Sequence, residues 1–217
     1  MKRRREIEKV SEIRSIIEEL SIEQGVIAKS GVDDHNNAAH ISIKPFLSFC
    51  NLVIQILDKI GPTMAVMRQD MHQNIQRLEK LQESDPSLYS NVVEILKKEA
   101  TEGSARKVAS CSRAFVWLTR SLDFTLALLQ SLLKDVGVNM EQAVEEAYNI
   151  SLKPWHGWIS SAACKVGLKL VPDNKTFVRI LMTKDEDHDT LKEEMQTLVS
   201  LLTPLLGDIH SILASSI

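Results

Sequence analysis

This 217-residue sequence has few of the residues that build disulfide frameworks, zinc sites or phosphate-binding loops. Its three cysteines, Cys50, Cys111 and Cys164, lie far apart, and no Cys-x-x-Cys pair occurs. Each has apolar neighbours in the sequence, which predicts buried thiols in a reducing compartment. The eight glycines form neither a G-x-G-x-x-G nor a Walker A pattern, so the common phosphate-binding loops are excluded.

Sequence motifs for catalysis and metal binding are also missing. There is no H-E-x-x-H, G-x-S-x-G or D-x-D-x-D-G pattern, and the six histidines never fall at metal-ligand spacing. We therefore expect no enzyme activity, no metal and no cofactor. The net charge of −3 lacks the basic excess that is typical of nucleic-acid binding, so we expect no nucleic-acid partner.

Long hydrophobic runs are absent as well. The longest runs, such as residues 126–129, fall far short of the about 20 residues that a membrane-spanning helix needs. The basic cluster at residues 2–5 either attracts anionic lipid or is a solvated chain end. It is followed by Glu6 and Glu8 rather than by the apolar segment of a signal peptide. We therefore expect a soluble cytoplasmic protein.

Glycine, proline and aromatic residues are scarce, whereas apolar residues recur at three- and four-residue spacing, which is typical of amphipathic helices. No alternating strand pattern is visible. We predict an all-α fold in one domain. The predicted helices cover residues 7–20, 44–60, 63–82, 92–96, 108–133, 140–152, 154–170, 191–202 and 205–213, with a short helix after Pro172.

A stripe of polar residues borders the apolar face of the helix predicted over residues 63–82. Asp70, Asn74 and Arg77 occupy positions i, i+4 and i+7, so they lie in one row along that helix. An acid, an amide and a guanidinium in a row can bond several hydroxyls of one ligand. The alternative is an Asp–Arg pair on the helix surface with an incidental Asn.

The three tryptophans lie in two short segments. Trp117, one helical turn after Arg113, is either a core residue or a flat platform on which a ligand stacks. Trp155 and Trp158 flank His156 at the start of a predicted helix, where i, i+3 spacing lets two indoles share a face. That pair is either a membrane anchor at the headgroup level or a packed corner of the core.

Three motifs occur in the order found in the glycolipid transfer protein family. They are Asp-x-x-x-Asn-x-x-Arg at 70–77, Trp-Leu-x-Arg at 117–120 and Trp-His-Gly-Trp at 155–158. The sequence resembles this family from about Lys44 to about Met182, and segments 57–61, 74–80 and 84–86 resemble its plant members. The resemblance implies an all-helical two-layer sandwich that encloses a sphingolipid and carries it between membranes.

The resemblance also implies roles for individual residues. Asp70 and Asn74 would bond headgroup hydroxyls, and Asp70 would also reach the ceramide amide N–H. Trp117 would stack on the first sugar, and His156 would bond the ceramide carbonyl. Trp158 would touch the membrane, and we expect Trp155 to dock there with it.

Two positions depart from the family pattern. Arg77 stands where the motif commonly has Lys, which keeps the charge and changes its geometry. The ceramide-1-phosphate branch of the family carries two Arg one turn apart where this chain has Arg113 and Trp117. The chain thus looks closest to the glycosylceramide branch, with an additional cation in Arg113 that suits a phosphate or sulfate.

We therefore expect a cytosolic protein that transfers one glycosylceramide between membranes as a monomer. The alternatives are a ceramide-1-phosphate carrier and a lipid-sensing scaffold that moves no cargo. Residues 1–43, an N-terminal helix and loop, are expected to belong to the same domain as residues 44–217.

Overall fold

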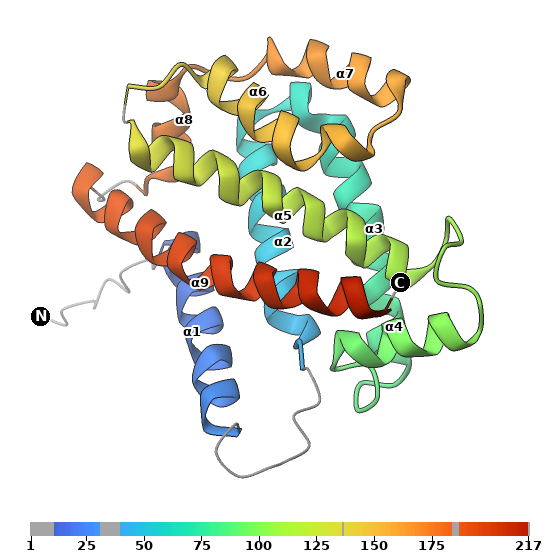
Figure 1. Ribbon diagram of the computed structural model, residues 1–217. Coiled ribbons are helices and arrows are strands. Elements are labelled where there is room, and N and C mark those ends of the chain that lie inside the picture. Colours follow the sequence, from blue (N-terminus) through green and yellow to red (C-terminus); the bar gives the residue numbers. More distant parts are fainter. Residues whose placement is uncertain (1–10, 31–39, 136, 184–186, 217) are drawn as a thin grey trace, which may run out of the picture.

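The computed structural model describes residues 11–30, 40–135, 137–183 and 187–216, and over these ranges the chain is helical and contains no strand. The all-α prediction is confirmed. Figure 1 shows the helices in order along the chain. They are α1 (Glu12–Ser30), α2 (Ile43–Ile60), η1 (Pro62–Met64), α3 (Ala65–Ser84), α4 (Val92–Thr101), α5 (Cys111–Lys134), α6 (Met140–Ser151), η2 (Lys153–Trp155), α7 (Trp158–Leu168), α8 (Asn174–Leu181) and α9 (His188–Ser216).

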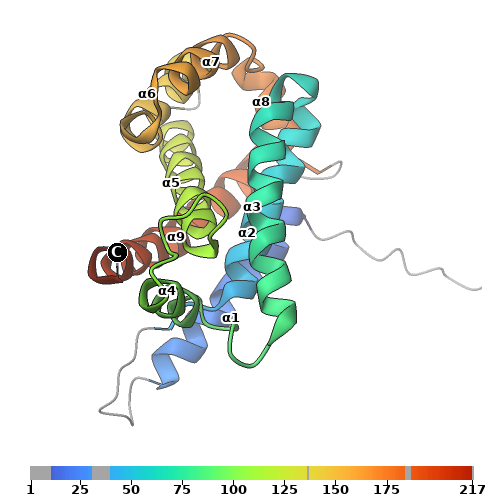
Figure 2. The ribbon, with the colours of Figure 1, turned by 90° about the vertical axis from the view of Figure 1, so that its right-hand side faces the viewer.

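The helices form the two layers that the family resemblance implied. Helices α1, α2, α3 and α8 make one layer, and α4, α5, α6 and α9 make the other (Figure 2). Across the layers, α3 packs on α5 and α1 packs on α9. Helix α7 follows α6 at one end of the sandwich and leads to α8 in the opposite layer.

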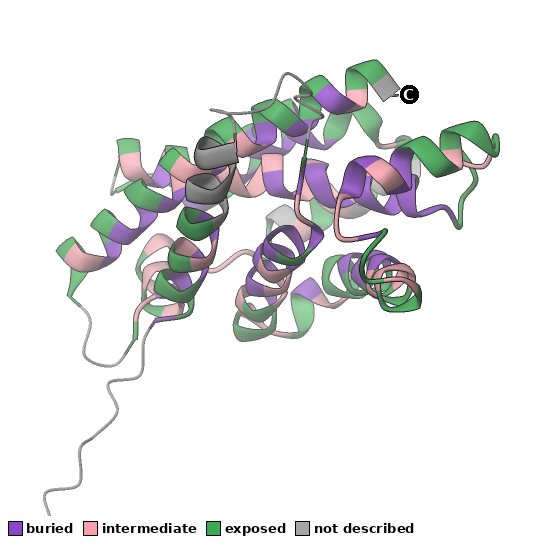
Figure 3. Ribbon diagram, turned by 90° about the horizontal axis from the view of Figure 1, so that it is seen from below, coloured by how far each residue is buried: buried purple, intermediate pink, exposed green. Residues whose placement is uncertain are grey.

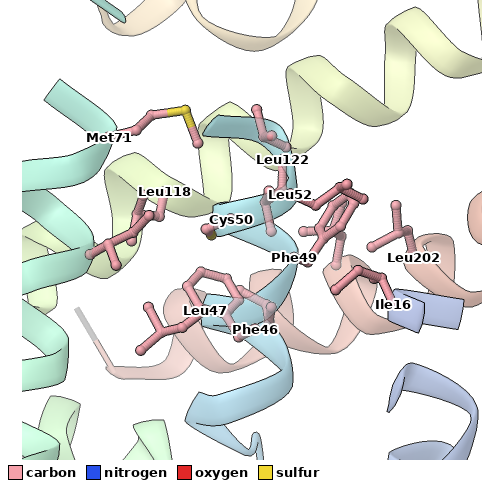
Figure 4. Close-up of a cluster of buried hydrophobic side chains, with 14 of the residues drawn as sticks. Ile16, Phe46, Leu47, Phe49, Cys50, Leu52, Met71, Leu118, Leu122 and Leu202 are labelled. Carbon is pink, nitrogen blue, oxygen red and sulfur yellow. The ribbon is translucent and has the colours of Figure 1, made fainter. Parts of the chain in front are cut away.

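Helix α2 supplies much of the interior. Its side chains are apolar on most sides, and Figure 4 shows them surrounded by residues of α1, α3, α5 and α9. Phe46, Phe49 and Cys50 have almost no exposed surface. Fully burying a Phe or Leu side chain stabilises the fold by about 1.5–3 kcal/mol. Seen from below, the buried residues face inward and exposed residues cover the outside (Figure 3).

Helix α2 ends where the sequence predicts a break. Gly61 has a φ of +110°, a conformation that strains any residue with a Cβ atom. Pro62 then begins the short helix η1, which leads into α3. This turn places the polar stripe of α3 beside the interior helices.

The first turn of α5 is capped from two directions. The Ser110 hydroxyl accepts a hydrogen bond from the backbone N–H of Arg113 at 3.0 Å. Glu99 of α4 accepts from the N–H groups of Cys111 and Ser112 at 2.8 and 2.7 Å. A carboxylate at a helix N-terminus satisfies free donors and interacts favourably with the helix dipole. These bonds hold the end of α5 that carries the candidate ligand residues.

Predicted helix boundaries near both ends of the chain are wrong. The predicted pair of helices split at Pro204 is one continuous helix, α9, with Pro204 inside it. A proline inside a helix costs about 3 kcal/mol, but Leu202 and Leu206 on either side are buried. At the other end of the chain, α1 continues to Ser30, through the first part of a segment predicted to be a loop. The basic cluster at residues 2–5 lies outside the described residues.

Helix α9 is also the only described helix that is long and apolar enough to cross a membrane, judged by length and composition alone. The core helix of a soluble protein passes the same test. Helix α9 packs against both α1 and α5, and Leu198 and Ile209 are buried in these contacts. Its apolar residues therefore belong to the interior of the sandwich.

Candidate functional site

The predicted polar stripe is a connected row of contacts along α3. Asn74, only 8% exposed, donates through its amide to the backbone oxygen of Asp70 at 3.0 Å and to its carboxylate at 3.4 Å. Arg77 donates to the Asn74 side-chain oxygen at 3.3 Å and to the carbonyl of Val108 at 3.5 Å. The Asn is thus not incidental, because it bridges the acid and the guanidinium.

The Asp70 carboxylate lies in a partly desolvated position, although the residue as a whole is exposed. Loss of solvent raises the pKa of Asp70, and the charges of His156 and Arg77 partly oppose the increase. The influence of His156 shows that the structure brings α3 close to the segment before α7. A carboxylate with poor solvation gains most from a ligand that donates hydrogen bonds to it.

Trp117 of α5 and His156 form the second part of the site. Their rings stack with centroids 5.5 Å apart and planes inclined by 29°. The ring of Tyr148, on α6, lies 5.7 Å from the imidazole on a tilted plane. Trp117 is half-buried, so it is neither a fully enclosed core residue nor a freely rotating surface side chain.

His156 is held by polar groups from α6 and α7. Its Nδ1 atom lies 3.2 Å from the Tyr148 hydroxyl and 3.8 Å from the Cys164 sulfur. Partial burial lowers the pKa of His156, the charge of Arg120 lowers it further, and the charge of Asp70 opposes both. The imidazole is therefore neutral at physiological pH, with one N–H available as a donor.

Arg120 is a site residue to which the sequence reasoning gave no role, although it ends the Trp-Leu-x-Arg motif. Its guanidinium carbon lies 5.0 Å from the ring centroid of Trp117 and 3.8 Å from that of Trp155. Burial lowers the pKa of Arg120, and the nearby charge of Arg113 lowers it further. Arg113 itself is exposed. Two cations of α5 therefore flank Trp117 along the helix.

Trp155 and Trp158 are both exposed, by 56% and 82%. The predicted helix over residues 154–170 is wrong in its first turn. Trp155 ends the short helix η2, His156 and Gly157 are extended, and Trp158 begins α7. The two indoles are therefore not neighbours on one helical face. The exposure also excludes the alternative in which Trp158 packs in a corner of the core.

The thiols differ from the prediction at one position. Cys50 and Cys111 are buried, whereas Cys164 is only half-buried and lies beside His156. Burial raises the pKa of Cys164, which disfavours the thiolate that a nucleophilic cysteine needs. Among the described residues, no group of three or more His, Cys, Asp or Glu could hold a metal ion.

A groove of about 360 Å³ lies where α6 packs on α5. Small and apolar residues make up most of its lining, and none of the predicted ligand residues belongs to it. The lining residues are Ala127, Ser131, Ala143, Glu146, Ala147, Asn149 and Ile150.

Comparison with known proteins identifies the family. The model of the family described as Glycolipid transfer protein matches residues 41–183. The chain belongs to the glycolipid transfer protein family. The matched range is close to residues 44–182, over which the motifs predicted the resemblance. Members of this family are soluble lipid transfer proteins and are not known as enzymes.

Two relatives in this family come from Arabidopsis thaliana. Glycolipid transfer protein 3 is 60% identical over 209 residues, which cover 94% of this chain and 89% of the relative. Glycolipid transfer protein 2 is 56% identical over 216 residues, which cover 98% of this chain and 95% of the relative.

Solved structures of the same fold confirm the two-layer helical architecture. A structure that describes how FAPP2 selects simple glycosphingolipids matches with a TM-score of 0.74 at 25% identity, covering 84% of this chain and 87% of that one. A variant of Arabidopsis ACD11 (accelerated-cell-death 11), complexed with C12 ceramide-1-phosphate, matches with a TM-score of 0.80 at 20% identity. That match covers 96% of each chain, and at this identity it concerns the fold alone.

Proposed function

We propose that this chain binds one glycosylceramide and carries it between membranes without changing it chemically. Membership of the glycolipid transfer protein family supports sphingolipid transfer. The choice of a sugar headgroup is supported by one observation, which is that an aromatic residue, Trp117, stacks on His156 and lies beside Arg120. A flat indole offers a sugar ring an apolar face to stack on, which a second arginine at this position would not.

The polar groups around Trp117 suit the rest of the headgroup. Asp70 and Asn74 bond sugar hydroxyls, and the Asp70 carboxylate also accepts from the ceramide amide N–H. The Tyr148 hydroxyl lies 3.2 Å from Nδ1 of His156. The proposed role uses the tautomer in which Nδ1 accepts from this hydroxyl and the Nε2–H of the neutral ring donates to the ceramide carbonyl. Arg77 keeps Asn74 in place through its bond to the side-chain oxygen.

The two-layer arrangement suits the hydrocarbon chains. Each CH₂ group transferred from water to an apolar environment contributes about 0.8 kcal/mol, so shielding the chains between the layers favours extraction of the lipid. The side chains of α2, α3 and α5 that meet between the layers are apolar. Polar contacts then select the lipid, because the apolar term is the same for any chain of equal length.

Trp155 and Trp158 dock on the membrane in this proposal. Their exposure supports the role, since exposed indoles favour the headgroup level of a bilayer. The protein works as a cytosolic monomer that touches membranes transiently. Residues 1–43 and 44–217 form one domain, which the packing of α1 on α2 and α9 supports.

Ceramide-1-phosphate is the second candidate ligand. It is favoured by the two cations, Arg113 and Arg120, that flank Trp117 on α5. A guanidinium binds a phosphate through paired, charge-assisted hydrogen bonds. A phosphate headgroup would therefore use the charge of the exposed Arg113, whereas a neutral sugar does not need it.

Two measurements test the proposal. Native mass spectrometry of the purified protein identifies the lipid that co-purifies, and we expect a glycosylceramide. A vesicle assay then measures transfer of labelled glucosylceramide in competition with ceramide-1-phosphate. Stronger competition by ceramide-1-phosphate than by unlabelled glucosylceramide supports the second candidate. Tight binding without intermembrane transfer supports the lipid-sensing scaffold.

A further inference from the structure

The side chains of Trp155, Arg120, Trp117 and His156 are in contact one after another. The guanidinium of Arg120 lies 3.8 Å from the ring centroid of Trp155 and 5.0 Å from that of Trp117. The Trp117 ring in turn stacks on His156 with centroids 5.5 Å apart. This row, here called the aromatic–cation stack, runs from an exposed indole on η2 to the half-buried residues of the ligand site.

Arg120 holds a charge in an unfavourable position. Burial and the neighbouring charge of Arg113 both lower its pKa, and only Asp123 raises it. The Asp123 carboxylate contacts another group, since its Oδ1 atom lies 2.9 Å from Nε2 of His210. The two indole faces, at 3.8 and 5.0 Å, therefore offset part of the solvation that the guanidinium loses through burial. Cation–π contacts strengthen in this situation, from about 0.5–1 kcal/mol when exposed to about 2 kcal/mol when desolvated.

We propose that Arg120 is a positioning residue that ties the loop of residues 155–157 to Trp117. By holding Trp155, it fixes the segment that presents His156, and by contacting Trp117 it prevents that indole from rotating. The platform for the sugar and the donor for the ceramide carbonyl are thus set in place before the ligand arrives. This inference rests on the proposed function. It assigns the orientation of Trp117 and His156 to a residue that does not itself contact the ligand.

An arginine suits this position better than a lysine. The guanidinium is flat and can lie against two ring systems, whereas an ammonium is a compact point charge that keeps its water more strongly. The proposal therefore predicts that a lysine at position 120, which keeps the positive charge, does not hold the two indoles in place. A direct contact between Arg120 and the headgroup predicts the reverse, because a lysine would restore much of such a contact.

The test compares Arg120→Lys and Arg120→Gln with Lys153→Gln, a control that removes an exposed cation of η2. Lys153 donates to Asn149 at 2.9 Å and takes no part in the stack. Binding of a water-soluble, short-chain glucosylceramide is measured without membranes, which separates positioning from docking. We expect both Arg120 variants to bind about 3- to 30-fold more weakly. The control binds like the wild type. Wild-type affinity in Arg120→Lys would overturn the proposal.

A double-mutant cycle shows whether Arg120 acts through Trp155. We expect the variant carrying Arg120→Gln and Trp155→Leu to bind no more weakly than the weaker single variant. Additive losses would mean that Arg120 acts independently of Trp155, and they would overturn the proposal.

The ligand-free protein gives a separate measurement. In a Trp158→Phe background, Arg120→Gln should make the remaining indoles more accessible to acrylamide, with thermal stability measured alongside to confirm folding. Unchanged accessibility would overturn the positioning role. If the wild type binds no glucosylceramide, the proposed function fails, and this quenching result still decides whether Arg120 holds the stack.

Discussion

The imidazole of His156 stacks on the indole of Trp117, with ring centroids 5.5 Å apart. One residue belongs to α5 and the other to the extended segment before α7. Asp70 of α3 is near enough to His156 for its charge to raise the pKa of the imidazole, and α3 packs on α5, which carries Trp117. Residues from three separate motifs therefore converge on one site.

Replacing Asp70 with Val should reduce glycolipid transfer by about 100-fold or more while the fold survives. The carboxylate is the strongest acceptor in the polar stripe, and hydrogen bonds to a charged group contribute about 1.5–3 kcal/mol each. Loss of two such bonds accounts for the expected reduction. The measurement is transfer between vesicles, with circular dichroism to confirm helicity.

The matched control is Gln73→Val, which places the same apolar residue on an exposed position of α3. It should transfer lipid at the wild-type rate. Wild-type transfer by Asp70→Val would mean that the stripe on α3 does not bind the ligand.

The stability of the protein should fall as the pH decreases below about 6.5, the ordinary pKa of histidine, and His156 should account for part of that loss. Burial lowers the pKa of His156 in the folded state, so protonation favours the unfolded chain. The contribution of His156 to stability is complete above the pKa that this histidine has in the unfolded chain. It is lost as the pH falls from there through the lower pKa of the folded state. His156→Gln removes it.

We therefore expect the melting temperature of the wild type to decrease more than that of His156→Gln between about pH 7.5 and about pH 5.5. Thermal unfolding followed by circular dichroism at several pH values measures the difference. Parallel curves for the two proteins would show that His156 titrates alike in the folded and unfolded chains.

Glu99→Ala should destabilise the protein by about 1–3 kcal/mol. The substitution leaves the N–H groups of Cys111 and Ser112 without the carboxylate that accepts from both. Because Arg113 and Trp117 follow within two turns, ligand affinity should also fall. Chemical denaturation measures the change, and Glu145→Ala, at an exposed position on α6, is the control and should be near neutral.

Pro204→Ala should stabilise the protein by about 1–2 kcal/mol. A proline inside a helix costs about 3 kcal/mol relative to alanine, and about 1 kcal/mol of the gain is lost because alanine makes the unfolded chain more flexible. The side chain is exposed, so its removal leaves no cavity. Gln196→Ala, elsewhere on the exposed face of α9, should change stability far less. A destabilised Pro204→Ala variant would show that the ring makes packing contacts.

The sequence predicted most of the helices because three- and four-residue spacing of apolar residues reports directly which face is buried. It failed at Pro204, where local propensity predicts a break and burial of Leu202 and Leu206 on both sides outweighs it. Its failure at residues 154–158 has a different cause. Periodicity cannot show that His156 and Gly157 adopt extended backbone between two short helical segments.

Prediction of the candidate site from the sequence has the same limit, because residue spacing describes only one helix at a time. Asp70, Asn74 and Arg77 were predictable as one row because a single helix carries them, and helical spacing determines which residues align. The contacts of Arg120 with Trp155, and of His156 with Cys164, join segments that meet only in the folded chain. A single sequence contains the motif that includes Arg120 but no signal that the two indoles lie on the same guanidinium.

Trp158→Ser should weaken binding to vesicles by about tenfold and slow transfer accordingly, while binding of a water-soluble glycolipid stays unchanged. Burial of a large apolar side chain contributes about 1.5–3 kcal/mol, enough for this change in affinity. Trp158 is 82% exposed and makes few contacts that a substitution could disturb. Leu88→Ser, which removes another exposed apolar residue away from α7, should bind vesicles like the wild type. If Trp158→Ser reduces soluble-lipid binding as strongly as vesicle binding, Trp158 contributes to the ligand site and not to docking.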